Sequence, residues 1–200
     1  TLNINGGSAS SAGTTKYYGT GIDVNFGGEL SVQNGATVNL KDLNRGTISS
    51  KPSSSPDTAG QFTLDSATMT ATNIGGNFSN GGDWTIDDST LTMNGVGNYG
   101  LSAGTITTTG SSQITATGVA YSAIYGHNEI NIGGTTEGNV TDCGSGLPYR
   151  SEGNYGDATA PIQLKVVRDN KDDTETGTKP NSDAKIVIAE GAKVTVENCV

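Results

Sequence analysis

Three aspartates have a spacing that could support acid–base chemistry. Asp65 and Asp87 occupy the same position in two similar segments whose sequences match at a shift of 22 residues, and Asp88 follows directly. If these segments form neighbouring strands, the two carboxylates lie about 5 Å apart on an outer edge. Such a pair resembles the carboxylates of a retaining glycoside hydrolase, and it could equally hold a cation such as Ca²⁺. The simplest interpretation is a row of solvated carboxylates near a corner of the chain.

Tyrosine is the most frequent aromatic residue, with seven Tyr against three Phe and one Trp. The tyrosines fall in predicted loops or at corners, where a ring offers a flat face to a sugar and its hydroxyl offers a hydrogen bond. Tyr99 and Tyr121 each precede a predicted strand and should lie close together. The alternative role for these rings is corner packing. The residues predicted to contact a ligand are Tyr17, Tyr18, Tyr99, Tyr121, Tyr149 and Tyr155.

Residues suited to metal or nucleophilic chemistry are sparse. His127 is the only histidine, and we expect it at a corner without a catalytic role. Cys143 and Cys199 lack the close spacing of a metal site; they could form a disulfide or remain free thiols. The acidic run at 169–173 lacks the ligand pattern of an EF-hand loop, which favours a solvated loop tip. We therefore expect no cofactor, with Ca²⁺ as the alternative.

The elements that must position these residues are short strands of an internal repeat. Segment 62–71 matches segment 84–93 position for position, and the next copy starts at Ile106 with one extra residue at its bend. Segments 30–40 and 186–196 share that longer bend. Each copy contains two runs in which apolar and polar residues alternate, as in strands with one buried face. The small residues expected at the corner between the runs are Ala36, Ala67, Ser89, Ser112 and Ala192.

A third short strand should complete each repeat, marked in successive copies by Ile22, Phe78, Leu101 and Ile124. One coil cannot bury its own apolar row, whereas stacked coils bury every row and pair every edge except at the ends. The sequence therefore predicts an all-β fold: a single-stranded right-handed parallel β-helix, a three-sided solenoid of about seven or eight coils of roughly 22 or more residues. Its inward rows should contain Leu30, Phe62, Trp84, Ile106, Ile130 and Ile186, and Val38, Met69, Leu91, Ile114 and Val194.

The outward positions of these strands are rich in threonine. The repeat should align Thr63 with Thr85 and Thr107, Thr68 with Thr90, and Thr70 with Thr92 and Thr115. Flat Thr-x-Thr arrays on β-solenoids resemble those of ice-binding proteins. Asn39 and Lys193 interrupt the array at its ends, and Thr also suits any exposed strand because it is β-branched.

Composition and chain organisation narrow the function. We expect one domain over residues 1–200, a fragment of a larger protein, with loop insertions at about 44–60 and 133–184. The net charge of −9 opposes binding to nucleic-acid phosphates and to anionic membranes. No apolar run is long enough for membrane insertion by this segment. A Gly-rich, acidic and turn-rich chain is typical of secreted all-β proteins.

Two phrases carry a resemblance to a known family. Gly-x-Leu-x-Val-x-x-Gly-Ala-x-Val-x-Leu at 28–40 and Ile-x-Ile-x-x-Gly-Ala-x-Val-x-Val at 186–196 are similar to the pectate-lyase-like β-helix repeats of bacterial cell-surface, adhesin-type proteins. The resemblance implies a non-catalytic extracellular module for adhesion or carbohydrate binding, with a glycan or a host or cell-surface protein as partner. The same fold also hosts enzymes, so a polysaccharide lyase or hydrolase that uses Asp65 and Asp87 is one alternative. An ice-binding Thr-rich face is another.

Overall fold

A computed structural model describes residues 1–11, 14–24, 27–49, 60–144, 160–164 and 185–199. Over these residues the fold is all-β and contains no helix, so it includes no helical membrane span. Most of the two predicted insertions, and with them Tyr149, Tyr155 and the acidic run 169–173, lie outside the described residues.

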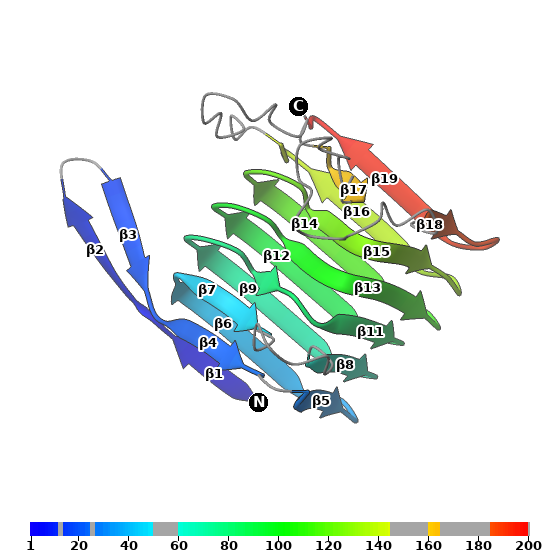
Figure 1. The fold of residues 1–200 in the computed structure, drawn as a ribbon, viewed down its shortest axis with the longest axis horizontal. Helices are drawn as coiled ribbons and strands as arrows, with labels where there is room; N and C mark the ends of the chain where they lie inside the picture. Colours follow the sequence, from blue (N-terminus) through cyan, green and yellow to red (C-terminus); the bar gives the residue numbers. More distant parts are fainter. Residues whose placement is uncertain (12–13, 25–26, 50–59, 145–159, 165–184, 200) are drawn as a thin grey trace, which may run out of the picture.

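The first sheet collects the second run of each repeat into seven parallel strands (Figure 1). Each strand pairs in register with its counterpart in the next repeat, for example Leu91 with Met69 on one side and with Ile114 on the other. The repeat found in the sequence is therefore a physical stack of strands. In sheet order the strands are β1 (Leu2–Asn5), β6 (Thr37–Leu43), β9 (Thr68–Ile74), β12 (Thr90–Val96), β14 (Gln113–Val119), β16 (Glu137–Thr141) and β19 (Lys193–Glu197).

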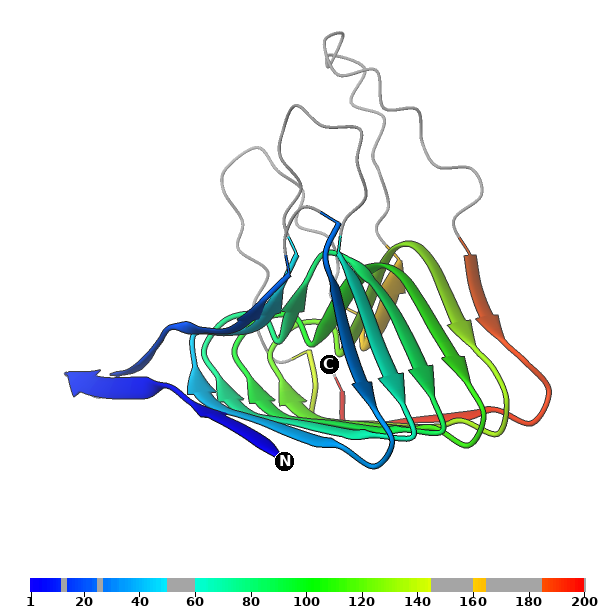
Figure 2. The ribbon, with the colours of Figure 1, turned by 90° about the horizontal axis from the view of Figure 1, so that it is seen from below.

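The second sheet collects the first run of each repeat, again with parallel pairing. It rises from one edge of the first sheet, so that each strand turns a corner into its partner in the first sheet (Figure 2). Its strands are β5 (Glu29–Gln33), β8 (Gln61–Asp65), β11 (Asp83–Asp87), β13 (Leu101–Thr109) and β15 (Ile124–Ile132), together with β17 (Ile162–Leu164) and β18 (Lys185–Ile188), which both pair with β15.

Two smaller sheets complete the described fold. The third sheet is parallel and contains β4 (Thr20–Asp23), β7 (Arg45–Ile48) and β10 (Ser79–Asn80). An antiparallel hairpin, β2 (Gly7–Ser11) and β3 (Thr14–Tyr18), projects from the N-terminal end of the stack (Figures 1 and 2). Parallel sheets of this kind, formed by strands about 22 residues apart, are compatible with a β-solenoid.

The third strand of each repeat differs from the prediction in two respects. The register pairs Ser79 with Thr47, so Phe78 lies one position away from the row in which it was expected, although it is fully buried. In the later repeats, β13 and β15 run from the third-strand position directly into the second sheet, with a register shift between Ala103 and Thr105. Alternation within one short segment does not show whether the chain bends between two strands, so this corner was not predictable.

Both corners of the first sheet depend on residues with positive φ, a conformation that Gly, Asn and Asp tolerate best. Where the second sheet turns into the first, Ser66 (φ 52°), Asp88 (φ 44°) and Gly110 (φ 61°) occupy successive coils. The predicted small residues follow them, and Ala67, Ser89 and Ser112 are buried. At the opposite end of the first sheet, every strand from β6 to β19 is followed or ended by one left-handed residue that precedes an apolar residue or a cysteine; these left-handed residues are Asp42, Asn73, Gly95, Gly118, Asp142 and Asn198.

The core lies between the first and second sheets and contains the predicted inward rows. Trp84 is 1% exposed, its ring stacks on Phe62 at a centroid distance of 4.9 Å, and its Nε1 donates a hydrogen bond to Ser79 Oγ (3.0 Å). This confirms its prediction as a core residue. The rows open at the end of the stack: Ile186 continues the row of Ile130 but is 43% exposed, because β18 pairs with β15 alone among the described strands.

Candidate functional site

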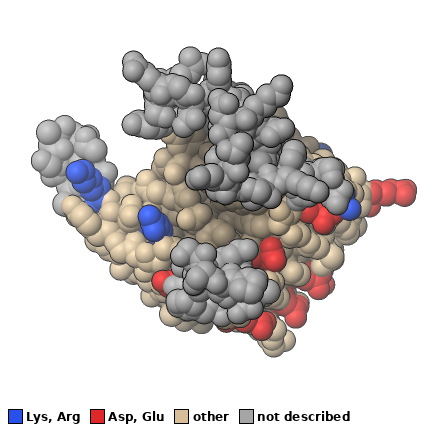
Figure 3. Space-filling model, viewed as in Figure 1, with Lys and Arg blue, Asp and Glu red and all other residues tan. Residues whose placement is uncertain are grey.

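The acidic corner, defined as Asp65, Asp87 and Asp88, lies where the second sheet turns into the first. The register of β8 and β11 places Asp65 beside Asp87, in agreement with the predicted alignment, and the next residue of this row is Thr109. Figure 3 shows acidic side chains along the edge of the molecule where strands of the second sheet end. The row thus brings two carboxylates to neighbouring strands.

Each carboxylate of the acidic corner accepts a hydrogen bond from the protein itself. Thr109 Oγ1 donates to Asp87 Oδ1 (2.6 Å), and the Ser111 backbone N–H donates to Asp88 Oδ1 (2.7 Å). Asp65 Oδ1 accepts from the neighbouring Ser66 hydroxyl (3.1 Å). The bonds to Asp87 and Asp88 connect one corner to the next, whereas the bond to Asp65 stays within its own corner.

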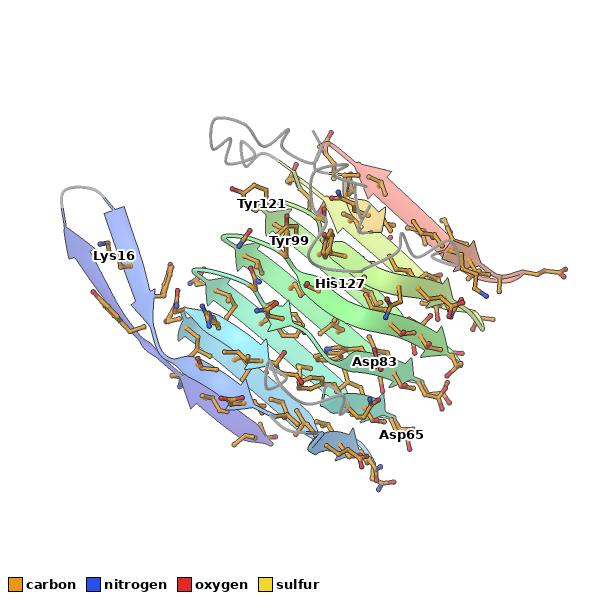
Figure 4. All side chains as sticks on the ribbon, in the orientation of Figure 1. Lys16, Asp65, Asp83, Tyr99, Tyr121 and His127 are labelled. Carbon is orange, nitrogen blue, oxygen red and sulfur yellow. The ribbon has the colours of Figure 1, made fainter. Side chains whose placement is uncertain are left out.

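Metal binding receives no support from the part of the chain that the structure describes. Within it, no three His, Cys, Asp or Glu side chains gather in an arrangement that could hold a metal ion. Asp83, at the opposite end of β11 from the acidic corner, likewise binds protein: its Oδ1 accepts the Thr105 N–H at 2.7 Å (Figure 4).

An aromatic cluster of Tyr99, Tyr121, Tyr125 and His127 lies at the start of β13 and β15 (Figure 4). Tyr99 contacts Tyr121 in a stacked arrangement, with ring centroids 5.4 Å apart, and Tyr125 in a tilted one at 4.8 Å. The His127 ring meets Tyr125 edge-on at 5.1 Å. Four rings separated by up to 28 positions in the sequence therefore form one continuous group.

The coil stack positions this aromatic cluster. Tyr99 and Tyr121 are 22 residues apart, so they stand at nearly equivalent places in consecutive coils. The Tyr99 N–H donates to Asn77 Oδ1 (3.4 Å), and the Tyr121 N–H donates to the Asn98 carbonyl (3.1 Å). Tyr125 is 8% exposed, whereas Tyr99 and Tyr121 are half-buried. Part of the ring surface therefore remains at the surface of the described residues.

The other predicted tyrosines lie apart from this cluster. Tyr17 and Tyr18 are the last two residues of the hairpin strand β3. Figure 4 labels the preceding residue, Lys16, at the left of the view, away from Tyr99 and Tyr121. A Cβ on Gly75 would lie 2.9 Å from Tyr17 Cδ2, so the Tyr17 ring rests directly on this glycine and is half-buried. Tyr18 is 55% exposed. Of the predicted tyrosines that the structure describes, only Tyr99 and Tyr121 therefore lie together.

The outward face of the first sheet forms a second feature, which we name the hydroxyl–amide face. It consists of the outward residues of three adjacent strands, all uncharged. The register confirms the predicted alignment of Thr70 with Thr92 and Thr115, and that of Thr68 with Thr90. The face contains Thr68, Thr70, Thr72, Thr90, Thr92, Asn94, Gln113, Thr115 and Thr117.

Charged residues bound the hydroxyl–amide face on either side. Lys41 stands beside Thr72 on the N-terminal side, and Glu137 stands beside Gln113 on the C-terminal side. Asn39 continues the central row and donates a hydrogen bond from Nδ2 to Asn3 Oδ1 (2.7 Å). The predicted interruption by Asn39 therefore changes the side-chain chemistry from hydroxyl to amide but leaves the row uncharged.

The two cysteines lie at adjacent positions, and no disulfide joins them in this structure. Cys143 is buried and Cys199 is half-buried, and the Cys143 N–H donates to Cys199 Sγ at 3.4 Å. Burial is the main cause that raises the pKa of the Cys143 thiol, and the neighbouring Cys199 raises it further.

Two members of the aromatic cluster were missed as ligand-binding candidates from the sequence. Tyr125 and His127 were assigned to a corner, but both belong to the single long strand β15. Tyr125 and His127 are two positions apart, and alternate residues of a strand point to the same face. This spacing was the signal that could have placed both rings on one face.

Comparisons with protein-family models, with curated proteins and with solved structures found no match to this chain.

Proposed function

We propose that this chain is a non-catalytic extracellular module of a bacterial cell surface that binds glycans, built on a right-handed, three-sided β-solenoid. The parallel register between successive repeats supports the solenoid. Its handedness follows from the general preference of parallel strands for right-handed crossover connections. In this view the stack is a rigid scaffold, and the ligand contacts its surface.

The aromatic cluster is the observation that carries the glycan proposal. Sugar rings present C–H faces that pack on aromatic rings, while tyrosine hydroxyls can bond to sugar hydroxyls. Tyr99 and Tyr121 are half-buried and stack on each other. Tyr99 also packs against Tyr125, whose ring meets His127, so these contacts orient the rings before a ligand arrives. Such preorganisation lowers the entropy cost of binding.

The charge of the chain favours a neutral glycan. Asp and Glu total 20 against 11 Lys and Arg, so an anionic polysaccharide would meet overall repulsion. The hydroxyl–amide face supplies uncharged donors and acceptors of the type that bind sugar hydroxyls. A neutral polysaccharide on the outer wall of a bacterial or host cell is therefore the ligand class we favour.

The test is a glycan array followed by calorimetric titration of any neutral hit. We expect the variant Tyr99→Ala/Tyr121→Ala to bind about tenfold or more weakly, since each ring contributes on the order of 1 kcal/mol. Tyr18→Ala is the matched control: it removes an exposed tyrosine from the hairpin, and it should bind like the parent protein. Full binding by the double variant would overturn the assignment to this cluster.

A polysaccharide-active enzyme is the second candidate, favoured by the in-register neighbours Asp65 and Asp87. Its pair would have to work despite the hydrogen bonds that already occupy the carboxylates. Product analysis on the same glycans distinguishes the two functions. Cleavage that disappears in Asp65→Asn/Asp87→Asn would establish the enzyme, whereas binding without cleavage supports the adhesive module.

The aligned threonines of the hydroxyl–amide face favour a third candidate, ice binding. Thr92 lies at the centre of this face, with Thr70 and Thr115 beside it. Thermal hysteresis of the parent protein that is lost in Thr92→Lys would support this function. Absence of hysteresis would leave the face available for glycan binding alone.

A further inference from the structure

The two cysteines occupy the same corner position in consecutive coils. Thr141 pairs with Glu197 in the first sheet, and each is followed by a residue with positive φ, Asp142 (53°) and Asn198 (52°). A cysteine comes next in both coils. The preceding coils fill this inward column with apolar residues, namely Leu43, Ile74, Val96 and Val119. The column therefore ends on two stacked thiols.

The two side chains have matching surroundings. Cys143 Sγ lies 3.1 Å from the carbonyl oxygen of Thr141, and Cys199 Sγ lies 3.3 Å from that of Glu197, two residues earlier in each case. The Cys143 N–H donates to Cys199 Sγ at 3.4 Å, so one sulfur already lies against the other residue. Parallel neighbours have Cα atoms about 4.8 Å apart, within the range of about 4.4–6.8 Å that disulfides span. The bridge is therefore compatible with the strand register of β16 and β19.

We propose that Cys143 and Cys199 form a disulfide that fastens β19, the last described strand of the first sheet, to β16. This inference stands independently of the proposed glycan binding, because it depends on the register of the first sheet alone. It assigns a covalent modification to the two cysteines of the sequence.

The reaction is a thiol–disulfide exchange with a low-molecular-weight disulfide as oxidant. Cys199 is the more exposed thiol, so its thiolate attacks the oxidant, forms a mixed disulfide and releases one small thiol. The Cys143 thiolate then attacks Cys199 Sγ and expels the second small thiol. Two protein thiols are oxidised to one disulfide, the oxidant is reduced to two thiols, and the protons of the cysteines pass to the released thiolates. Burial, which raises the pKa of Cys143, assigns it the second step.

The bridge would join β16 to β19, the last described strand of the first sheet. All four residues of β18 are exposed, and β19 pairs only with β16 among the described strands. Among the described strands, β19 and β1 each pair with one neighbour in the first sheet, so these end strands should detach more easily than the middle ones. A bond from Cys199 to Cys143 closes a long loop and restricts the detached state, which slows exposure of β19.

The experiment compares reduced and oxidised forms of the same protein. Incubation of the folded chain with oxidised glutathione should lower its intact mass by about 2 Da, the two hydrogens lost in disulfide formation. A non-reduced peptide digest should contain Cys143 linked to Cys199. Amide hydrogen exchange of Val194 and Val196 should then be at least about tenfold slower than in the reduced protein. A stable glutathione adduct on Cys199, or two thiols that still react with iodoacetamide, would overturn the proposal.

A displaced cysteine provides the matched control. In Asn198→Cys/Cys199→Ser the thiol moves to the exposed left-handed position next to the column. This variant keeps a thiol at the same end of β19 but moves it off the inward column of Cys143, so it should remain reduced under the same treatment. If it bridges Cys143 as readily as the parent chain does, the register is not what selects the pair, and the inference fails.

Discussion

Ile106 and Ile186 belong to one inward row of the second sheet, but they differ in burial. Ile106, in a middle coil, has strands on both sides and is fully buried, whereas Ile186, in the last coil, is 43% exposed. The two segments share the same alternation and form the same kind of strand. The comparison shows that alternation specifies the strand, while the neighbours on both sides determine how much that strand stabilises the fold.

A column of small residues at the corner shows the same contrast. Ser112, in a middle coil, places its hydroxyl 2.8 Å from the Thr109 carbonyl and accepts the Ser89 N–H at 3.3 Å. Thr136 is the next residue of the column and borders the last coil, where Ala192 follows it. Its Oγ1 is buried and has no hydrogen-bond partner among the described residues. The hydrogen bonding that joins Ser89 to Ser112 therefore does not continue to Thr136, one coil before the last described coil.

The largest expected effect separates the two isoleucines. Ile106→Ala should lower the free energy of unfolding by about 2–5 kcal/mol, because it opens a cavity between two paired strands. Ile186→Ala should cost about 1 kcal/mol or less, because much of its surface already contacts water. Urea unfolding of both variants provides the measurement. Equal losses of stability in the two variants would show that Ile186 is covered in solution, contrary to the difference in burial between the two isoleucines.

Ser112→Ala should have the next largest effect, a loss of about 1–3 kcal/mol in the free energy of unfolding. The substitution leaves the buried Ser89 N–H without its acceptor. Thermal and urea unfolding can be compared with Ser111→Ala, which alters the exposed neighbour at the same bend. Similar stabilities for the two variants would mean that the hydrogen bond between Ser89 and Ser112 contributes little to stability.

Thr136→Val should raise the free energy of unfolding by up to about 1 kcal/mol, since valine keeps the shape of threonine and removes a buried hydroxyl to which no described residue hydrogen-bonds. This effect has the opposite sign to that of Ser112→Ala, because the Ser112 hydroxyl is hydrogen-bonded and the Thr136 hydroxyl has no partner among the described residues. Thr136→Ala is the control, because it removes the hydroxyl and a methyl group together. Destabilisation by Thr136→Val would indicate that the hydroxyl has a partner in solution.

The smallest expected effect concerns the ion pair that connects β18 to β15. Lys185 Nζ lies 2.7 Å from Glu129 Oε1, and this hydrogen bond is the main cause that lowers the pKa of Glu129 below its ordinary value of 4.5. A lowered folded-state pKa contributes stability at pH above that value and loses it as pH falls through the folded pKa. NMR titration should show a higher Glu129 pKa in Lys185→Met. The difference in urea midpoint between parent and variant should shrink below about pH 4.5. If the difference in urea midpoint does not change with pH, it arises from side-chain packing and not from the ion pair.

Several features of the fold were predictable from the sequence because they depend on local spacing. The shift of 22 residues placed Phe62 beside Trp84 and Asp65 beside Asp87, and the register of β8 and β11 confirms both pairs. The inward rows followed from alternation, since strand side chains point to opposite faces in turn. The misplacement of Phe78 arose because Ser79 and Thr47, which share a buried row, have no apolar signature in the sequence.

The candidate site was less predictable, because it combines residues of separate coils. Tyr99 and Tyr121 could be expected to lie together from their spacing, but the inclusion of Tyr125 and His127 depends on β15 continuing without a bend. The left-handed residues before Cys143 and Cys199 form a pattern of Asx or Gly followed by an apolar residue or Cys. That pattern is visible in the sequence once the register is known, and it would have aligned the two cysteines.

The all-β class, the repeat length and most of the inward-facing residues can be derived from the sequence alone, because strand alternation and turn chemistry are local properties of the chain. Which coils are fully buried, which carboxylates bind to neighbouring corners and which rings and thiols meet depend on the tertiary structure. These outcomes depend on pairing between strands that are far apart in sequence, and pairing distance is a property of the stack.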